Sequence, residues 1–278
     1  MDRLIRVLFA FDAERPVLTV AALARRTELP LATAYRWVDR LVRAELLQKD
    51  EDGVVRPGLR LWEMASRSAP SMSLARTAMP FLVDVQSVLR QHTQLAVLDA
   101  EGVLVLERLS AREAVANQAT VAGRLPPFST SLGLVLLAFA PPGEAERFVE
   151  RHRAQLGAPV RVLRPDGGGA RPASAHPAVV APTEAELRAL LADVRREGHA
   201  AVDGAIDAEA RGIAVPVRGP LGHAVAALGV VVPRSATSTP GVPALLMTAA
   251  RGIGRALGPT GLGGDARTDG GGDGRQRA

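Results

Sequence analysis

Apolar residues near the start of the chain recur at helical spacing in three short segments. They predict a first helix over about 3–12, a second helix that begins after Thr19, whose hydroxyl can cap it, and a third over about 31–45. The segment 28–30 contains proline and separates the last two. Two short apolar runs flanking 50–53, which ends in glycine, predict a hairpin. Helix, helix, short break, helix and hairpin is the order typical of a winged helix-turn-helix.

The third predicted helix has two chemically different sides. At 100° per residue, one side collects Ala34, Trp37, Val38 and Leu41, which can pack against the other helices. A separate side, here named the arginine stripe, collects Thr33, Arg36, Arg40 and Arg43. Arginines on a helix in the major groove can bind guanine edges or phosphates, with a hydroxyl near a phosphate at the helix N-terminus.

An ordinary amphipathic helix with a solvated charged face would show the same pattern. The preceding helix, the break and the hairpin therefore decide in favour of DNA binding. The arginines of the second helix are expected to lie outside with the stripe. The predicted DNA-binding residues are Arg25, Arg26, Thr33, Tyr35, Arg36, Arg40 and Arg43.

The chain after the first domain alternates valine-rich and amphipathic segments. An amphipathic helix from Leu74 to Leu89 is expected to be broken near its start by Pro80. Strands are predicted at 94–98, 102–106, 115–121, 213–217 and 225–232, and helices at about 131–140, 143–155, 184–197 and 241–257. Grouped strands with helices packed against them indicate an α+β layer. The stretch 157–182 predicts a long flexible loop.

Composition narrows the possible functions. The 278 residues suit about two domains, and 47% apolar with 23% charged residues excludes wholesale disorder. The lack of cysteine excludes disulfides, thiolate metal sites and a cysteine nucleophile. No apolar run approaches the ~20 residues needed to cross a bilayer and no export signal opens the chain, so a cytoplasmic protein without membrane contact is expected. The net charge of only +5 means that DNA binding must be argued from local placement.

The sequence contains no recognisable motif for catalysis or for metal binding. The five histidines are scattered, with no pair at ligand spacing, and no Gly-x-Ser-x-Gly motif occurs. The stretch 252–258 faintly resembles a dinucleotide-binding turn, but it closes a helix instead of following a strand, so helix-end glycines explain it better. We therefore expect no enzymatic activity, no catalytic residues, no metal and no cofactor.

The segment LTVAALARRTELPLATAYRWVDRLVRAELLQKDEDGVVRPGLRLWEMA resembles the DNA-binding domain of the IclR family of bacterial transcription regulators. Four further segments resemble the rest of that family in the same order: 74–106, 129–138, 211–217 and 226–230. The resemblance implies an α+β protein in which a winged helix-turn-helix domain (1–60) is joined by a linker helix (61–73) to a GAF-like effector-binding domain (74–257). A disordered tail (258–278), poor in apolar residues, would follow.

The chain departs from the family pattern at several positions. Leu31 and Ala32 replace a usual basic residue and serine, so DNA affinity is expected to depend more on the arginines. Leu134 replaces a usual lysine. Where the late strands of the family are often polar, this chain has Gly212, Gly229 and Val231, which predicts a roomier and less polar pocket.

A hydroxyl-rich segment, Phe128–Ser131, precedes an apolar helix. Free backbone N–H groups and the helix dipole there suit a carboxylate, although simple capping by a hydroxyl explains the residues equally well. The resemblance also places the effector near an aspartate and an arginine, which could otherwise form a local ion pair. The predicted effector-binding residues are Phe128, Ser129, Thr130, Ser131, Gly133, Asp203, Arg211, Gly212 and Gly229.

Together these features predict a ligand-responsive, sequence-specific DNA-binding regulator. A homodimer, or a tetramer of paired dimers, would place two copies of the third helix in successive major grooves of a near-palindromic operator in double-stranded DNA. A small-molecule effector, an organic acid or aromatic catabolite, would bind the second domain. An enzyme and a protein–protein adaptor remain as alternatives. Trp37 and Trp62 are expected to be packing residues.

Overall fold

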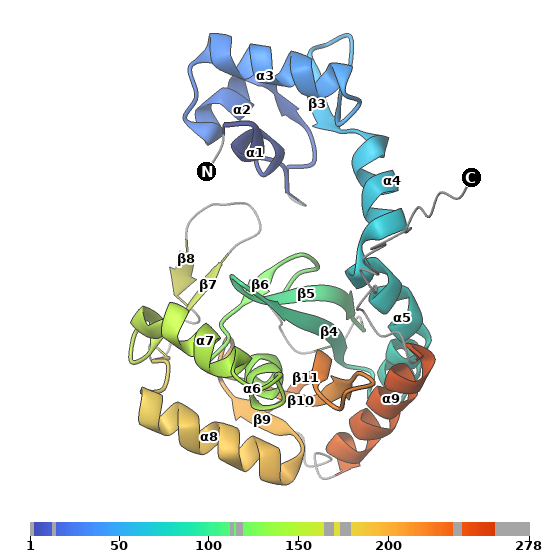
Figure 1. Ribbon diagram of the computed structural model, residues 1–278, viewed down its shortest axis with the longest axis vertical. Helices are drawn as coiled ribbons and strands as arrows, with labels where there is room; N and C mark the ends of the chain where they lie inside the picture. The colour runs from blue at the N-terminus through green and yellow to red at the C-terminus, as the bar shows by residue number, and fades with distance from the viewer. Residues whose placement is uncertain are drawn as a thin grey trace, which may run out of the picture.

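The computed structural model describes residues 3–12, 15–111, 114, 119–163, 170–172, 179–235 and 241–258. A small N-terminal domain is joined by helix α4 to a larger domain built on a curled, eight-stranded sheet (Figure 1). The molecule is thus a mixed helix-and-sheet protein with a helix-turn-helix domain at its N-terminus, as the sequence predicts. The predicted tail lies outside the described residues except for Gly258.

The N-terminal domain has the predicted element order. Its elements are α1 (Arg3–Leu8), β1 (Leu18–Thr19), α2 (Val20–Thr27), α3 (Leu31–Arg43), β2 (Leu47–Lys49) and β3 (Val54–Pro57). The Thr19 hydroxyl caps α2 by accepting from the Ala22 amide at 3.2 Å, and Gly53 has the expected positive φ of 78° in the hairpin. Helix α1 is shorter than predicted. Strand β1, which pairs with β3, was not predicted because two residues are too short to show an alternating pattern.

The apolar side of α3 anchors this helix in the domain core. Ala34, Val38 and Leu41 are buried, and Trp37 is partly buried against the same cluster. The packing role predicted for Trp37 is therefore confirmed. The same prediction is wrong for Trp62, whose side chain on α4 is 64% exposed in this chain.

Two consecutive helices connect the domains. Helix α4 (Leu59–Ser68) leads into α5 (Pro70–Leu89), and the predicted break at Pro80 is wrong because α5 continues through it. Pro80 lies on the exposed side of α5, while the residues on the opposite side pack on the sheet and stabilise the helix across the proline. The predicted domain boundaries at 60 and 73 stay a prediction.

The larger sheet runs β8-β7-β6-β5-β4-β11-β10-β9 with every neighbouring pair antiparallel. Its strands are β4 (His92–Asp99), β5 (Gly102–Leu109), β6 (Arg124–Leu125), β7 (Arg161–Leu163), β8 (Ala170–Pro172), β9 (Ala200–Asp203), β10 (Ala210–Arg218) and β11 (Ala224–Pro233). Helices α6 (Ser131–Ala138), α7 (Glu144–Arg151) and α8 (Glu184–Glu197) pack on one face, with a 3-10 turn, η1 (Arg153–Gln155), after α7. Helices α5 and α9 (Val242–Ala256) cover the other (Figure 1).

The structure corrects the predicted strands and loop. The strand predicted at 115–121 is wrong for 119–121, where 119 and 120 are irregular and a turn begins at 121, whereas 115–118 lie outside the described residues. The predicted loop 157–182 contains the β7–β8 hairpin. Strands β6 and β9 were not predicted, because strands of two to four residues carry little alternation.

Helix α6 is buried on all sides, because the sheet and the other two helices of its layer enclose it. Its eight apolar and small residues therefore show no amphipathic pattern. Within the described parts of the chain, no helix is both long enough and apolar enough to span a membrane.

Candidate nucleic-acid interface and ligand cavity

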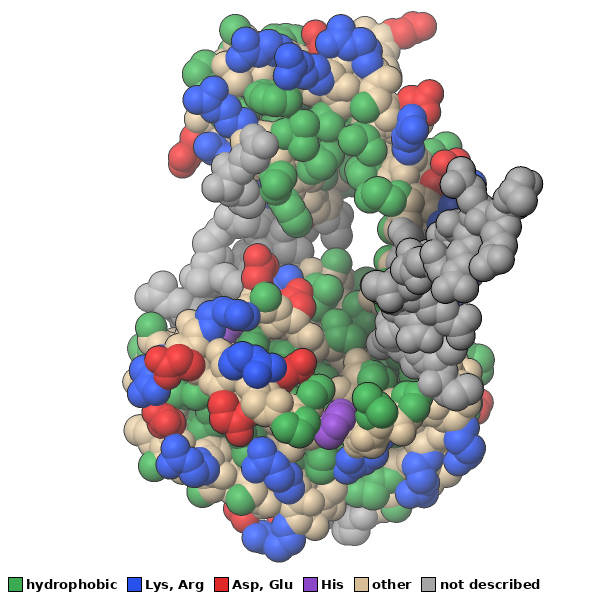
Figure 2. All heavy atoms as spheres, in the orientation of Figure 1, with side chains coloured by type: hydrophobic (Ala, Val, Ile, Leu, Met, Phe, Trp, Pro, Cys, Tyr) green, Lys and Arg blue, Asp and Glu red, His purple; other side chains and the backbone are tan. Residues whose placement is uncertain are grey.

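The arginine stripe lies on the surface of the N-terminal domain. Arg36, Arg40 and Arg43 are exposed and Thr33 is half-buried, on the side of α3 opposite its buried residues. Helix α3 occupies the edge of the domain that faces away from the larger domain, and basic side chains gather along that edge (Figures 1 and 2). The stripe is therefore accessible to a duplex.

Aromatic rings support two of the basic side chains. The Arg40 guanidinium lies 5.0 Å from the centre of the Trp37 ring, and Lys49 Nζ lies 5.5 Å from the centre of the Tyr35 ring. Lys49 belongs to β2 of the hairpin, so this contact joins the wing to α3. The sequence prediction missed Lys49, although a lone lysine at the start of a wing turn was a usable signal.

The N-terminus of α3 is open. Pro30 precedes the helix and makes no side-chain cap, and the amides of Leu31 and Ala32 have no acceptor among the described residues. The amide of Thr33 donates to the Pro30 carbonyl at 2.8 Å. Two free N–H groups beside the Thr33 hydroxyl can bind a phosphate despite the absence of a serine cap.

The two arginines of α2 differ in accessibility. Arg25 is exposed, as predicted. Arg26 pairs with Asp12 at 2.6 Å, and its side chain is only 17% exposed while that of Asp12 is 2% exposed. The expectation that Arg26 lies outside is therefore wrong, because its guanidinium compensates a buried carboxylate within the domain.

A cavity lies between the sheet and the N-terminal end of α6 in the larger domain. This inner cavity, of about 50 Å³, is lined by residues that include Gln94, Leu125, Thr130, Ser131, Asp207 and Gly212. The loop 204–209 between β9 and β10 contributes Ala205, Ile206 and Asp207 to its wall. Ligand pockets are commonly about 300–1,000 Å³, so a ligand enters only if this wall moves.

The segment Phe128–Ser131 is divided between two cavities. Thr130 and Ser131 line the inner cavity, whereas Phe128 and Ser129 line an outer cavity of about 380 Å³. Leu125 lines both cavities. Phe128 also packs edge-to-face against Phe148, with ring centres 5.9 Å apart.

Thr130 is the N-cap of α6. Its hydroxyl donates to the Pro126 carbonyl at 2.7 Å and accepts from the Gly133 amide at 3.3 Å. The amides of Ser131 and Leu132 have no acceptor among the described residues, and the buried Ser129 hydroxyl has no partner there. Capping therefore explains Thr130, but it leaves donors free at the inner cavity.

Three of the predicted effector-binding glycines make room for α6. A Cβ on Gly212 would lie 2.8 Å from Ser131 Oγ, and one on Gly229 would lie 2.9 Å from Leu132 Cδ2. A Cβ on Gly133 would overlap the Pro127 carbonyl. The expectation of a roomier pocket is therefore wrong, because the helix fills the space that the missing side chains leave.

Asp203 and Arg211 form a local ion pair across β9 and β10. Arg211 Nη2 donates to Asp203 Oδ2 at 2.8 Å, and both side chains are 32% exposed. The hydrogen bond from Arg211 lowers the pKa of Asp203 below its usual value, and the carboxylate raises the pKa of Arg211. Neither residue lines the inner cavity; they join the two ends of the loop 204–209.

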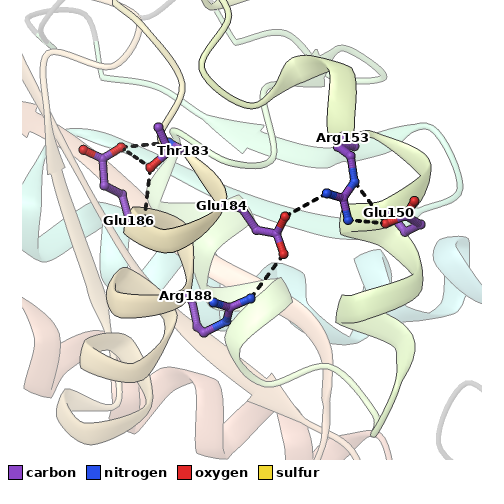
Figure 3. A network of polar contacts seen from close by, with 6 residues as sticks. All are labelled: Glu150, Arg153, Thr183, Glu184, Glu186 and Arg188. Atoms are coloured by element: carbon purple, nitrogen blue, oxygen red, sulfur yellow. Dashed lines mark hydrogen bonds and ion pairs between the residues drawn. The ribbon is translucent and has the colours of Figure 1, made fainter.

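A network of charged side chains ties α7 and η1 to α8 (Figure 3). Arg153 contacts Glu150 and Glu184, and Arg188 contacts Glu184 at 3.2 Å from the other side. These side chains are at least 40% exposed, so each pair contributes little stability. The network positions helices and offers no reactive group. Across the described parts of the chain, no His, Asp or Glu residues form a group that could hold a metal ion.

A winged helix-turn-helix domain with an exposed basic helix, joined to a domain with an internal cavity, defines a DNA-binding regulator with a ligand-binding domain. Two family descriptions match the chain: the IclR helix-turn-helix domain over residues 1–51 and the bacterial transcriptional regulator IclR C-terminal domain over residues 66–160. The chain belongs to the IclR family of transcriptional regulators.

Several known proteins are similar over most of the chain. An IclR homolog from Microbacterium hydrocarbonoxydans, solved in complex with 4-hydroxybenzoate, is 40% identical with a TM-score of 0.75, covering 92% of this chain and 97% of that one. A putative transcriptional regulator from Rhodococcus sp. RHA1 is 25% identical with a TM-score of 0.69, covering 92% and 96%. The Pca regulon regulatory protein of Pseudomonas putida is 26% identical over 83% of this chain and 72% of its own length.

Proposed function

We propose that this regulator binds a near-palindromic operator as a homodimer and responds to a small aromatic acid. The exposed arginine stripe, anchored from behind by the buried side of α3, is the observation that carries the DNA-binding part. Arg36, Arg40 and Arg43 would contact base edges and phosphates in the major groove, together with Tyr35. Arg25 and Lys49, both exposed, would contact flanking phosphates.

An exposed apolar face supports the homodimer. Phe9 on the turn after α1 is 74% exposed, and Leu59, Trp62 and Met64 on α4 are 69%, 64% and 59% exposed. Figure 2 shows hydrophobic side chains gathered on the N-terminal domain below α3. A second copy that covers this face would also hold two α3 helices at a constant spacing, as a palindromic site requires.

Two observations support an aromatic acid as the effector. The IclR homolog from Microbacterium hydrocarbonoxydans was solved with 4-hydroxybenzoate and is 40% identical over nearly its whole length. In this chain, the free amides at the start of α6 line the inner cavity and suit a carboxylate. Binding would displace the loop 204–209, and the shift would reach α3 through α5 and α4.

A selection experiment tests both parts of the proposal. The purified protein is mixed with fragments of its host genome, and the retained fragments are sequenced and titrated with salt and with 4-hydroxybenzoate. We expect a retained palindromic site, affinity that falls steeply with salt, and a shift in affinity and melting temperature on adding the acid. Retention of no fragment would contradict the DNA-binding part, and an acid without effect would contradict the effector part alone.

A further inference from the structure

Gln94 is a buried donor without a partner in the wall of the inner cavity. Its side chain is 2% exposed, and its Nε2 has no acceptor among the described residues. On β4 it faces the α6 layer, because Ala96, two residues later, packs in that layer, while Leu95 packs against α5 and α9. The Gln94 amide and the free amides of Ser131 and Leu132 therefore line one cavity from two elements.

Arg108 lies beside Gln94 as its cross-strand partner on β5. Its Nη1 donates to the carbonyl of Ala119, itself a cavity residue, at 2.7 Å, and its Nη2 lies 3.4 Å from His92 Nδ1. Its buried Nε has no acceptor, and no carboxylate within the described ranges pairs with it. Arg108 is half-buried, and this partial burial lowers the pKa of its guanidinium.

The opposite charge lies on the other side of the cavity. Asp207 on the loop 204–209 is the single acidic residue among the described cavity residues, and its Oδ1 accepts from the Glu209 amide at 3.0 Å. A ligand with one anionic end is repelled there and attracted toward β4, β5 and the start of α6. The wall is thus electrically asymmetric.

We propose that Gln94 and Arg108 determine the specificity of the inner cavity for carboxylates, with Gln94 donating a hydrogen bond to the acid group and Arg108 supplying the neutralising charge. The inference rests on the proposed ligand-binding role of this cavity and identifies the residues that would bind the carboxylate group of the ligand. An uncharged ligand of the same shape leaves Arg108 without a counter-ion, so the cavity discriminates between an acid and its amide.

Calorimetric titration of the full chain at pH 7.5 tests this proposal with two matched pairs of probes. The pairs are 4-hydroxybenzoate with 4-hydroxybenzamide and benzoate with benzamide. We expect wild type to bind at least one acid about tenfold or more tightly than its amide, and Gln94→Met to weaken the acid by a similar factor while changing the amide little. Arg108→Gln should bring the acid-to-amide ratio close to one, and Arg108→Lys should restore most of it.

Thr93→Val is the matched control, since this neighbouring threonine is also buried on β4 without a hydroxyl partner but faces the α5 and α9 layer. It should leave both affinities unchanged. If the acids bind but Gln94→Met and Arg108→Gln keep the wild-type ratio, the inference is overturned and the proposed function stands. If wild type binds neither acid, the proposed effector class is overturned as well. Should Arg108→Gln fail to fold, Gln94→Met decides by itself.

Discussion

Arg36 lies near the start of α3, within the exposed stripe and one turn after the open helix N-terminus. Its environment contains no ion pair among the described residues, unlike that of Arg26, whose guanidinium is held by Asp12. Two arginines that look alike in sequence therefore lie in different environments. One is free to contact a base edge and the other stabilises the domain.

We expect Arg36→Ala to abolish the preference for the operator while leaving the fold and the ligand response intact. A well-placed arginine contact to guanine contributes about 1–3 kcal/mol of discrimination, which is roughly a tenfold to hundredfold loss. Selection from random duplexes measures it. Arg196→Ala on α8 removes the same charge far from α3 and should change little. Selection of the same site by Arg36→Ala would show that α3 does not read it.

At the scale of elements, the contact between α6 and its surroundings determines the shape of the inner cavity. Three glycines let the helix approach the sheet and the Pro127 turn more closely than any side chain would allow. Arg195 on α8 further holds the other end of α6 by donating to the Ala138 carbonyl at 2.8 Å. The free amides at the start of α6 are thus held at the cavity wall.

Gly133→Ala should destabilise the larger domain although alanine favours a helix. The added Cβ overlaps the Pro127 carbonyl, so α6 must shift, at a cost of about 1–3 kcal/mol. A thermal melt should show a decrease of several degrees, with weaker ligand binding. Gly241→Ala, at the N-cap of α9 with φ −84° and nothing within 4 Å of the new Cβ, is the control. Equal melting temperatures would contradict the packing role.

At the scale of the whole molecule, α4 leads from the N-terminal domain to α5 on the larger domain (Figure 1). Its side chains Leu59, Trp62 and Met64 are each more than half exposed. Exposing Trp62 beside Leu59 and Met64 does not stabilise a monomer, whereas contiguous exposed apolar residues are typical of an interaction surface. A dimer that buries this face would couple the spacing of the two α3 helices to any movement of α5.

Trp62→Ala should raise the dissociation constant of the dimer about tenfold or more, because a buried interface tryptophan commonly contributes about 2 kcal/mol or more. It should not lower the stability of the monomer. Sedimentation velocity over a concentration series measures the shift toward monomer. Leu221→Ala, at an 86% exposed leucine in the β10–β11 turn, is the comparison variant and should not change the association. An unchanged dimer in Trp62→Ala would place the interface elsewhere.

The local pattern of apolar, capping and turn residues predicted much of the fold correctly. The spacing of Ala34, Val38 and Leu41 placed α3 correctly, the Thr19 cap and the Gly53 turn were found, and the Thr183 start of α8 agrees with the predicted helix. Prediction failed where the environment overrides the local rule. Pro80 breaks no helix because the opposite side of α5 packs on the sheet, and the short strands β6 and β9 carry too few residues for a pattern.

The sequence by itself determined the helices and hairpin of the N-terminal domain, the family and the exposed stripe of α3, because each depends on neighbours within a few turns of chain. Only the tertiary structure decided which residues line the cavity. Gln94, Ser131 and Asp207 are far apart in the chain. They line one cavity because the strand order is β4-β11-β10-β9 and α6 packs on this sheet. Gly212 and Gly229, expected to widen the pocket, instead admit the helix, since whether a missing side chain leaves space depends on what packs against it.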